Sequence, residues 1–210
     1  MTDSATSTDA PPADDAALIA RARDGELAAY NTLVLRYQNA VYSLALRILS
    51  SPEAAEDATQ EAFIRGFRRL ESFRGGNFRS WLFSIVANAA RDELRRRGRR
   101  PQLSLDAARD DPDHADLDPP DSGPTPGEAA EQSELRRLLE HALTQLPDDW
   151  RTVVVLSDVQ GLSYQEIAET VGIATGTVKS RLSRARGRMR DLLRESGELA
   201  ERFQRLDSGR

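Results

Sequence analysis

The chain of 210 residues contains no cysteine and only two histidines, His114 and His141. The absence of cysteine excludes disulfides, thiolate zinc sites and thiol-based sensing, and two histidines are too few for a histidine-based metal cluster. No stretch approaches the run of about 18 apolar residues that a membrane-spanning helix needs. The acidic N-terminus also lacks the basic start and apolar core of a secretory signal. These absences predict a cytoplasmic protein with no membrane insertion, no metal and no cofactor.

Acidic residues outnumber basic ones, 34 against 29, but the two signs are segregated along the sequence. Residues 1–17 carry a net charge of −4 and residues 101–134 carry −9, whereas residues 18–100 carry +6 and residues 135–210 carry +2. A basic block is what a phosphate-binding surface needs. The acidic average therefore hides two candidate nucleic-acid-binding segments. All basic residues except Lys179 are arginine, a ratio for which GC-rich codon usage accounts in large part.

Composition divides the chain into two modules and three connecting or terminal segments. Six of the ten prolines fall within residues 101–134, which contain no aromatic residue. Such a segment cannot bury enough apolar surface to offset its ordering entropy, which predicts a flexible acidic linker. The linker joins an N-terminal module, residues 18–100, to a C-terminal module, residues 135–195. A disordered acidic tail, residues 1–17, and a C-terminal tail, residues 196–210, complete the predicted organisation.

The N-terminal module is predicted to be helical throughout. Apolar residues recur every three or four positions over residues 30–49, as on one face of a helix. The pair Ser51-Pro52 is typical of a helix start, and that helix is predicted to run to about Ser72. Two glycines in residues 74–77 break the pattern. A further helix follows and is predicted to stop near Gly98.

The C-terminal module contains the pattern of a helix-turn-helix. Apolar spacing predicts helices over residues 135–146 and 148–157. A serine-to-glutamate capping box at residues 163–166 predicts a short helix that stops near Gly172. A longer helix is predicted from Thr175, and a short helix, a glycine turn and a second helix form a helix-turn-helix. The predicted fold class is therefore all-α, with an N-terminal domain of three to four helices and a C-terminal four-helix domain joined by the flexible linker.

The last predicted helix has a charge distribution suited to DNA. At about 100° per residue, its apolar residues from Val178 to Leu193 fall on one stripe, with basic residues on both flanks. Seven basic residues and one acid lie between Lys179 and Arg194. A helix in the major groove is held by such a seam, while its N-terminal side chains reach base edges and its flanks contact phosphate. An exposed arginine-rich helix without a ligand is the alternative, which the preceding turn spacing disfavours.

Particular blocks of both modules carry a resemblance to a known family. The blocks are DATQEAF (57–63), FRGG (73–76), FRSWL (78–82), DELRRR (92–97), LP (146–147), GLSY (161–164), EIA (166–168) and GTVKSRL (176–182). In this order and spacing, the chain resembles the extracytoplasmic-function (ECF) group of bacterial sigma factors, the RNA polymerase subunits that select promoters. The last block alone also occurs in other helix-turn-helix regulators, so the specificity comes from both modules together.

The resemblance implies three interaction sites. The residues that it implies for docking on the β′ subunit of core polymerase are Asp57, Gln60, Glu61 and Ile64. Those that it implies for opening and reading the −10 element are Phe73, Arg74, Asn77, Phe78, Asn88, Arg91 and Arg95. Those that it implies for reading the −35 element in duplex DNA are Thr177, Lys179, Ser180, Arg181, Arg184 and Arg188. Without the resemblance, Asp57 and Glu61 are equally well explained as the solvated acidic face of a helix.

The resemblance also implies the partners. These are the β′ and β subunits of core polymerase, promoter DNA and an anti-sigma factor. A stand-alone helix-turn-helix regulator acting as a dimer is the alternative, but such a regulator usually has a ligand-binding or dimerisation module in place of residues 18–100. An enzyme is a third alternative, and the sequence contains no glycine-rich phosphate loop, nucleophile elbow or metal-ligand cluster.

The charge of the linker suggests a regulatory hypothesis. Residues 101–134 are expected to fold back on the basic modules in the free protein and to lower their affinity for DNA until the polymerase extends them. The C-terminal tail has helical spacing at Leu199, Phe203 and Leu206, but no function is predicted for it.

Overall fold

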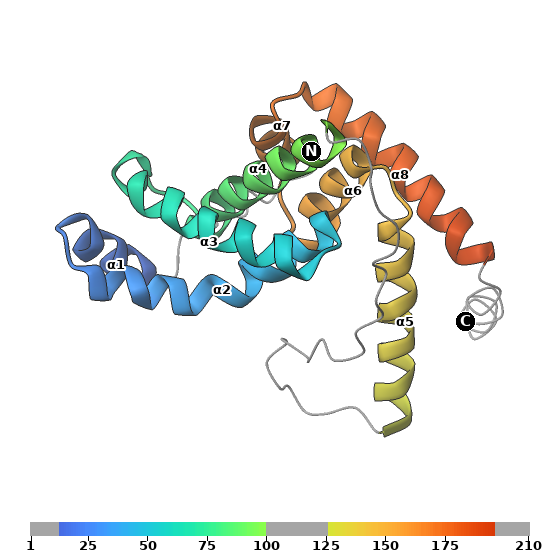
Figure 1. The fold of residues 1–210 in the computed structure, drawn as a ribbon, viewed down its shortest axis with the longest axis horizontal. Coiled ribbons are helices and arrows are strands. Elements are labelled where there is room, and N and C mark those ends of the chain that lie inside the picture. Colours follow the sequence, from blue (N-terminus) through green and yellow to red (C-terminus); the bar gives the residue numbers. More distant parts are fainter. Residues whose placement is uncertain (1–12, 100–125, 196–210) are drawn as a thin grey trace, which may run out of the picture.

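The computed structural model describes residues 13–99 and 126–195, and every element within these ranges is helical (Figure 1). The prediction of an all-α fold in two modules is therefore confirmed. The regulatory hypothesis concerns the linker, residues 101–134, and most of these residues lie outside the described ranges. The predicted C-terminal tail, residues 196–210, and the first twelve residues lie wholly outside them.

The N-terminal module consists of four α-helices and one short 3₁₀ turn. They are α1 (Ala13–Arg23), α2 (Leu27–Leu49), α3 (Pro52–Arg68), the turn η1 (Leu70–Ser72) and α4 (Phe78–Arg99). Helix α1 begins within the segment that the sequence predicts as a disordered tail, because Leu18, Ile19 and Ala22 are buried against the module. Helix α4 is described to Arg99, one residue past Gly98, near which the sequence predicts it to stop.

The connection between α2 and α3 follows from its two serines. Ser50 has a φ of 52°, which makes it the one described residue other than glycine with a positive φ. Its backbone N–H donates to the carbonyl of Leu46 and closes α2. The side chain of Ser51 then accepts from the N–H of Ala54, and Pro52 occupies the first turn of α3. The predicted helix start at this point is confirmed.

The C-terminal module contains four α-helices and one π-turn. They are α5 (Pro126–Thr144), α6 (Asp148–Val154), the π-turn η2 (Val155–Val159), α7 (Tyr164–Val171) and α8 (Thr175–Glu195). Helix α5 starts at Pro126, nine residues before the predicted start at 135, since a proline fits the first turn of a helix. The helix predicted over residues 148–157 changes to π geometry at Val155.

The predicted helix-turn-helix is present and its caps are formed as expected. The side chain of Ser163 accepts from the N–H of Glu166, and the carboxylate of Glu166 accepts from the N–H of Ser163 at 2.8 Å. This reciprocal pair satisfies two backbone donors at the start of α7. Gly172 has a φ of 68° and ends α7, a left-handed conformation that glycine adopts without strain.

Replacing Ser163 with alanine is expected to lower the free energy of unfolding by about 0.5–2 kcal/mol, because α7 loses its cap. Urea denaturation followed by circular dichroism measures the change. Ser183→Ala is the control, since Ser183 is exposed in the middle of α8. Equal losses in the two variants would contradict a specific role for the cap.

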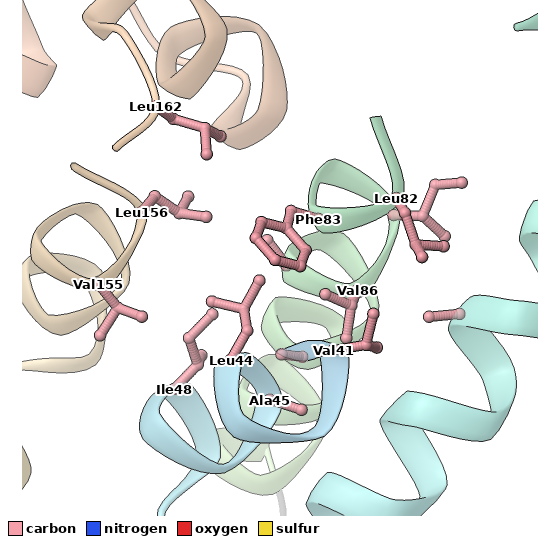
Figure 2. Packing of buried hydrophobic residues seen from close by; sticks show 14 of the residues in the cluster. Val41, Leu44, Ala45, Ile48, Leu82, Phe83, Val86, Val155, Leu156 and Leu162 are labelled. Atoms are coloured by element: carbon pink, nitrogen blue, oxygen red, sulfur yellow. The ribbon is translucent and has the colours of Figure 1, made fainter. Parts of the chain in front are cut away.

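The apolar side chains of the two modules form one continuous core. Figure 2 shows where they meet: Phe83 of α4 lies on the side that faces Leu156 and Leu162, and Ile48 of α2 faces Val155. Phe83 is 1% exposed and Leu156 is 0% exposed. Burial of a side chain of this size contributes about 1.5–3 kcal/mol relative to exposure. The modules are therefore packed together rather than merely tethered.

Three arginines add polar contacts to this packing. Arg91 donates to the carbonyl of Val171 at 2.6 Å, Arg151 donates to the hydroxyl of Ser50 at 3.1 Å, and Arg79 donates to the side-chain oxygen of Gln160 at 3.1 Å. We call these contacts, together with the apolar packing around Phe83, the intermodule interface. It joins α2 to α5, α6 and η2, and α4 to α7.

Candidate nucleic-acid and docking surfaces

Helix α3 presents a mixed acidic and apolar face to solvent. Asp57, Gln60 and Ile64 are exposed on it and Glu61 is partly exposed, in positions that recur every three or four residues. Glu61 forms an ion pair with Arg65 at 2.6 Å, one turn further along the same helix. Ile64 is 47% exposed. A large apolar side chain that remains exposed beside charged neighbours is typical of a protein-docking surface.

The loop between η1 and α4 combines buried rings with exposed polar residues. Phe73 is 6% exposed and Phe78 is 1% exposed, and their ring centroids lie 5.6 Å apart. The two rings predicted to contact DNA thus lie in the core of this structure, where they support the loop from within. Arg74 is exposed, and the side-chain oxygen of Asn77 accepts from the N–H of Ser80 at 3.0 Å and caps α4.

The three remaining α4 residues predicted to face the −10 element lie in different environments. Asn88 and Arg95 are exposed, whereas Arg91 is partly buried by its contact with Val171 at the intermodule interface. Burial lowers the pKa of Arg91, the nearby charges of Arg95 and Arg181 lower it further, and Asp149 opposes them. The intermodule interface thus places Arg91 of α4 near Arg181 of α8, close enough for the two positive charges to repel each other.

Helix α8 has the predicted seam and flanks. Val178, Leu182 and Ala185 are buried against the module. Of the residues predicted to read the −35 element, Lys179, Ser180, Arg184 and Arg188 are exposed, and Thr177 and Arg181 are partly buried. The structure brings all six to the first four turns of one helix.

Arg181 has a partner that the sequence did not indicate. Its guanidinium pairs with the carboxylate of Asp149 at 2.7 Å, and its Nη1 atom is buried with no hydrogen-bond partner in the described part of the chain. An exposed Asp149 therefore already occupies one donor group of a residue expected to contact DNA.

A second ion pair escaped the sequence reasoning. Arg186 donates to both carboxylate oxygens of Asp158, at 2.9 and 2.6 Å, and fastens α8 to the π-turn η2. The hydrogen bond from Arg186 lowers the pKa of Asp158. The two residues lie 28 positions apart, and no local spacing pattern links residues so distant in sequence.

The described residues contain no candidate metal site and no candidate membrane-spanning helix. Residues 13–99 and 126–195 include no group of three or more histidine, cysteine or acidic side chains placed to hold a metal ion. Within the same ranges, no helix combines the length and apolarity that crossing a membrane requires.

The structure combines an α-helical module, whose helix α3 exposes a mixed acidic and apolar face, with a helix-turn-helix module, whose last helix is basic, and this combination is typical of promoter-recognition subunits of the sigma-70 type. Comparison of the sequence agrees, since residues 33–100 match the family Sigma-70 region 2 and residues 136–189 match Sigma-70, region 4.

Similar curated proteins identify the branch of this family. The chain is 38% identical over 191 residues to the ECF RNA polymerase sigma factor SigE of Mycolicibacterium smegmatis, which covers 90% of this chain and 72% of that protein. It is also 38% identical over 179 residues to the ECF RNA polymerase sigma-E factor of Escherichia coli K12, with 82% and 90% covered. The chain belongs to the ECF family of RNA polymerase sigma factors, whose function is transcription initiation at promoters.

Two solved structures share the arrangement of helices. The sigma factor RpoE in complex with the anti-sigma factor NepR from Bartonella quintana has a TM-score of 0.59 at 28% identity, covering 79% of this chain and 96% of that one. CnrH in complex with the cytosolic domain of CnrY has a TM-score of 0.58 at 28% identity, covering 87% and 98%.

Proposed function

We propose that this chain binds core RNA polymerase through α3, reads the −10 element through the loop 73–78 and α4, and reads the −35 element through α8. The observation that carries the proposal is the form of α8, which is buried along one seam and exposes basic and polar side chains beginning directly after the turn of the helix-turn-helix. That geometry suits insertion into the major groove of DNA.

The docking role of α3 rests on its exposed face. Asp57, Gln60, Glu61 and Ile64 together offer carboxylates, an amide and an apolar side chain, which suit a basic and partly apolar partner surface. We assign that surface to the β′ subunit. The face lies outside the intermodule interface, so it is accessible while the modules are packed together.

The −10 role rests on the exposed residues of the loop and of α4. Arg74, Asn88 and Arg95 are exposed, and Asn77, directly before the first residue of α4, is partly exposed. Arginine contacts the backbone of a melted strand, and amides recognise the edges of unstacked bases. The buried Phe73 and Phe78 are assigned to the support of this surface.

The proposal is tested by adding the purified chain to core polymerase and mapping transcript starts on genomic DNA. Initiation at defined sites that depends on the chain supports it. A stand-alone dimeric helix-turn-helix regulator would instead bind DNA by itself and fail to form a stable complex with core. Absence of binding to core overturns the proposal in favour of that alternative.

Further partners and the location follow from the relatives. Both solved relatives named above are bound to anti-sigma factors or to a cytosolic partner domain. We therefore include an anti-sigma factor and a cytoplasmic location in the proposal. The polymerase β subunit is included because the resemblance to ECF sigma factors implies it. The chain is proposed to act without a cofactor and without catalysing a reaction of its own.

Arg181→Ala is expected to weaken binding to promoter duplex by about 1–3 kcal/mol if the side chain makes a bidentate contact to a base. Fluorescence anisotropy with the isolated holoenzyme and labelled −35 duplex measures the change. Arg190→Ala on the same helix removes the same charge and serves as the control. An equal loss on unrelated duplex would show that Arg181 contacts phosphate alone.

A further inference from the structure

Helix α1 lies outside both family matches, which begin at residues 33 and 136. The helix nevertheless packs on the N-terminal module through Leu18, Ile19 and Ala22. Two of its polar side chains, Asp15 and Arg23, reach other elements of the module. Both contacts lead to the loop 73–78 that the proposed function assigns to the −10 element.

Arg23 contacts the segment that enters this loop. Its Nε donates to the carbonyl of Leu70 at 3.1 Å, and its Nη2 donates to the carbonyl of Phe73. The guanidinium carbon also lies 6.0 Å from the centre of the Phe73 ring. The planar fork of an arginine can serve two backbone carbonyls at once, which the single ammonium of a lysine does with poorer geometry.

Asp15 is linked to Phe78, the last residue of the loop, through the side chain of Tyr37. Its carboxylate is 0% exposed and accepts from Arg36 and from the hydroxyl of Tyr37. The ring of Tyr37 lies 5.7 Å from that of Phe78, the first residue of α4. Helix α1 therefore contacts Phe73 at the entry to the loop and supports Phe78 at its exit.

The loop itself offers little to fix its own conformation. Gly75 and Gly76 have φ values of 92° and 87°, and, apart from their chain neighbours, no atom of the described residues lies within 4 Å of where a Cβ would stand on either glycine. A glycine pair with open space around it retains wide conformational freedom. The path of the loop thus depends on how firmly its two ends are held.

The contacts of α1 with both ends lead us to propose that Arg23 is a positioning residue for −10 recognition. By holding the carbonyls of Leu70 and Phe73, it sets the path along which Arg74 and Asn77 meet the DNA. This inference rests on the proposed function, because it requires that the loop 73–78 reads the −10 element. It assigns α1 to the DNA-reading apparatus without any contact of α1 to DNA.

A purely stabilising role would show itself differently. Arg23 lies at the edge of the core, and the rings of Phe73, Phe78 and Trp81 pack directly on one another, with centroids 5.3–5.6 Å apart. Removal of the guanidinium is therefore expected to leave the fold and the binding to core unchanged. The expected effect is confined to the loop and to the bases it discriminates.

The test uses holoenzyme made from the full chain, and a library of promoter-length duplexes with a randomised −10 region. Sequences selected by the unmodified holoenzyme supply a preferred duplex and its single-base variants, and initiation on each gives a discrimination ratio. Arg23→Ala is expected to lower this ratio by about fivefold or more, the smallest loss typical of a misplaced base contact. Arg23→Lys is expected not to restore it.

Arg21→Ala is the matched control, since Arg21 is exposed on the same helix and pairs with Glu26. Hydrogen exchange of the amides of residues 74–77 supplies a second readout. Faster exchange in Arg23→Ala, with unchanged exchange in Arg21→Ala and unchanged affinity for core in both, supports the inference. An unchanged ratio and unchanged exchange in Arg23→Ala overturn it.

Two loop variants separate failure of the inference from failure of the proposed function. Arg74→Ala removes an exposed loop side chain, and Asn77→Ser keeps an oxygen that caps α4 while removing the amide. If neither changes the discrimination ratio, the loop does not read the −10 element and the proposed function is wrong on this point. If either lowers the ratio while Arg23→Ala does not, the positioning role alone is wrong.

Discussion

A covalent link between the two modules is expected to abolish binding to a complete promoter while leaving binding to core polymerase intact. Arg79 and Gln160 are hydrogen-bonded across the intermodule interface, and the chain has no cysteine. The variant Arg79→Cys/Gln160→Cys therefore offers one defined pair of thiols to a flexible bis-maleimide reagent. Electrophoretic mobility shift on promoter DNA and a pull-down with core measure the two activities.

The physical reason is the distance between the two DNA elements. Elements two helical turns apart are separated by about 70 Å. In the packed arrangement, Arg181 of α8 is ion-paired with Asp149 at 2.7 Å. Both of these charges act on the pKa of Arg91 of α4, so Arg91 and Arg181 lie near each other. Surfaces held this closely cannot meet both elements at once, so the modules have to separate on promoter DNA.

A cleavable cross-linker supplies the control for this experiment. Cleavage after purification should restore promoter binding, and each single-cysteine variant treated with the reagent should bind promoter normally. Cross-linked protein that still binds both elements with full affinity would contradict the prediction. Failure of the two thiols to react together would contradict the packed arrangement in solution.

The double variant Gln60→Ala/Glu61→Ala is expected to weaken binding to core polymerase by about tenfold or more. Both side chains belong to the proposed docking face of α3, and we assign them to its centre, where the minority of interface residues that cost more than about 1 kcal/mol on truncation are found. Glu61 also orients Arg65 by their ion pair, which the variant removes. Surface plasmon resonance with immobilised core measures the affinity.

The matched control is Gln165→Ala/Glu169→Ala. These two residues form the same kind of amide and carboxylate pair on the exposed side of α7, with a hydrogen bond of 2.9 Å. Binding of each double variant to −35 duplex, measured without core polymerase, reports whether the C-terminal module is intact. Core affinity that falls equally in both variants, or in neither, would contradict the assignment of α3 to docking.

Local patterns predicted the starts of α3 and α7 well. Ser51 with Pro52, and Ser163 with Glu166, satisfy backbone donors within three residues, so the sequence alone contains the whole interaction. The seam of α8 was equally predictable, because its buried positions repeat with the period of one helix.

The start of the N-terminal module was placed too late for a reason that is visible in Asp15. An acidic, alanine-rich segment is typical of a disordered tail, and the burial of Asp15 depends on Tyr37 and Arg36 about twenty residues away. The spacing of Leu18, Ile19 and Ala22 was the available signal for α1. It was too short to outweigh the composition.

Sequence patterns alone do not separate a ring that stacks on a base from a ring that packs in a core. Phe73 and Phe78 flank a glycine pair in either case, and only the packing of Tyr37 and Trp81 around them decides the matter. The intermodule interface was unpredictable for the same reason, because Arg91 and Val171 lie 80 positions apart.

The contact between Arg91 and Val171 has a consequence for genetics. A substitution at Arg91 removes a bond that keeps the modules together and, under the proposed function, also removes a contact to the promoter. The first change favours transcription and the second opposes it, so their effects on promoter output partly cancel. A mutational scan scored by reporter expression would rank Arg91 as tolerant to substitution, although under the proposed function the residue contacts Val171 while the modules are packed and promoter DNA once they separate.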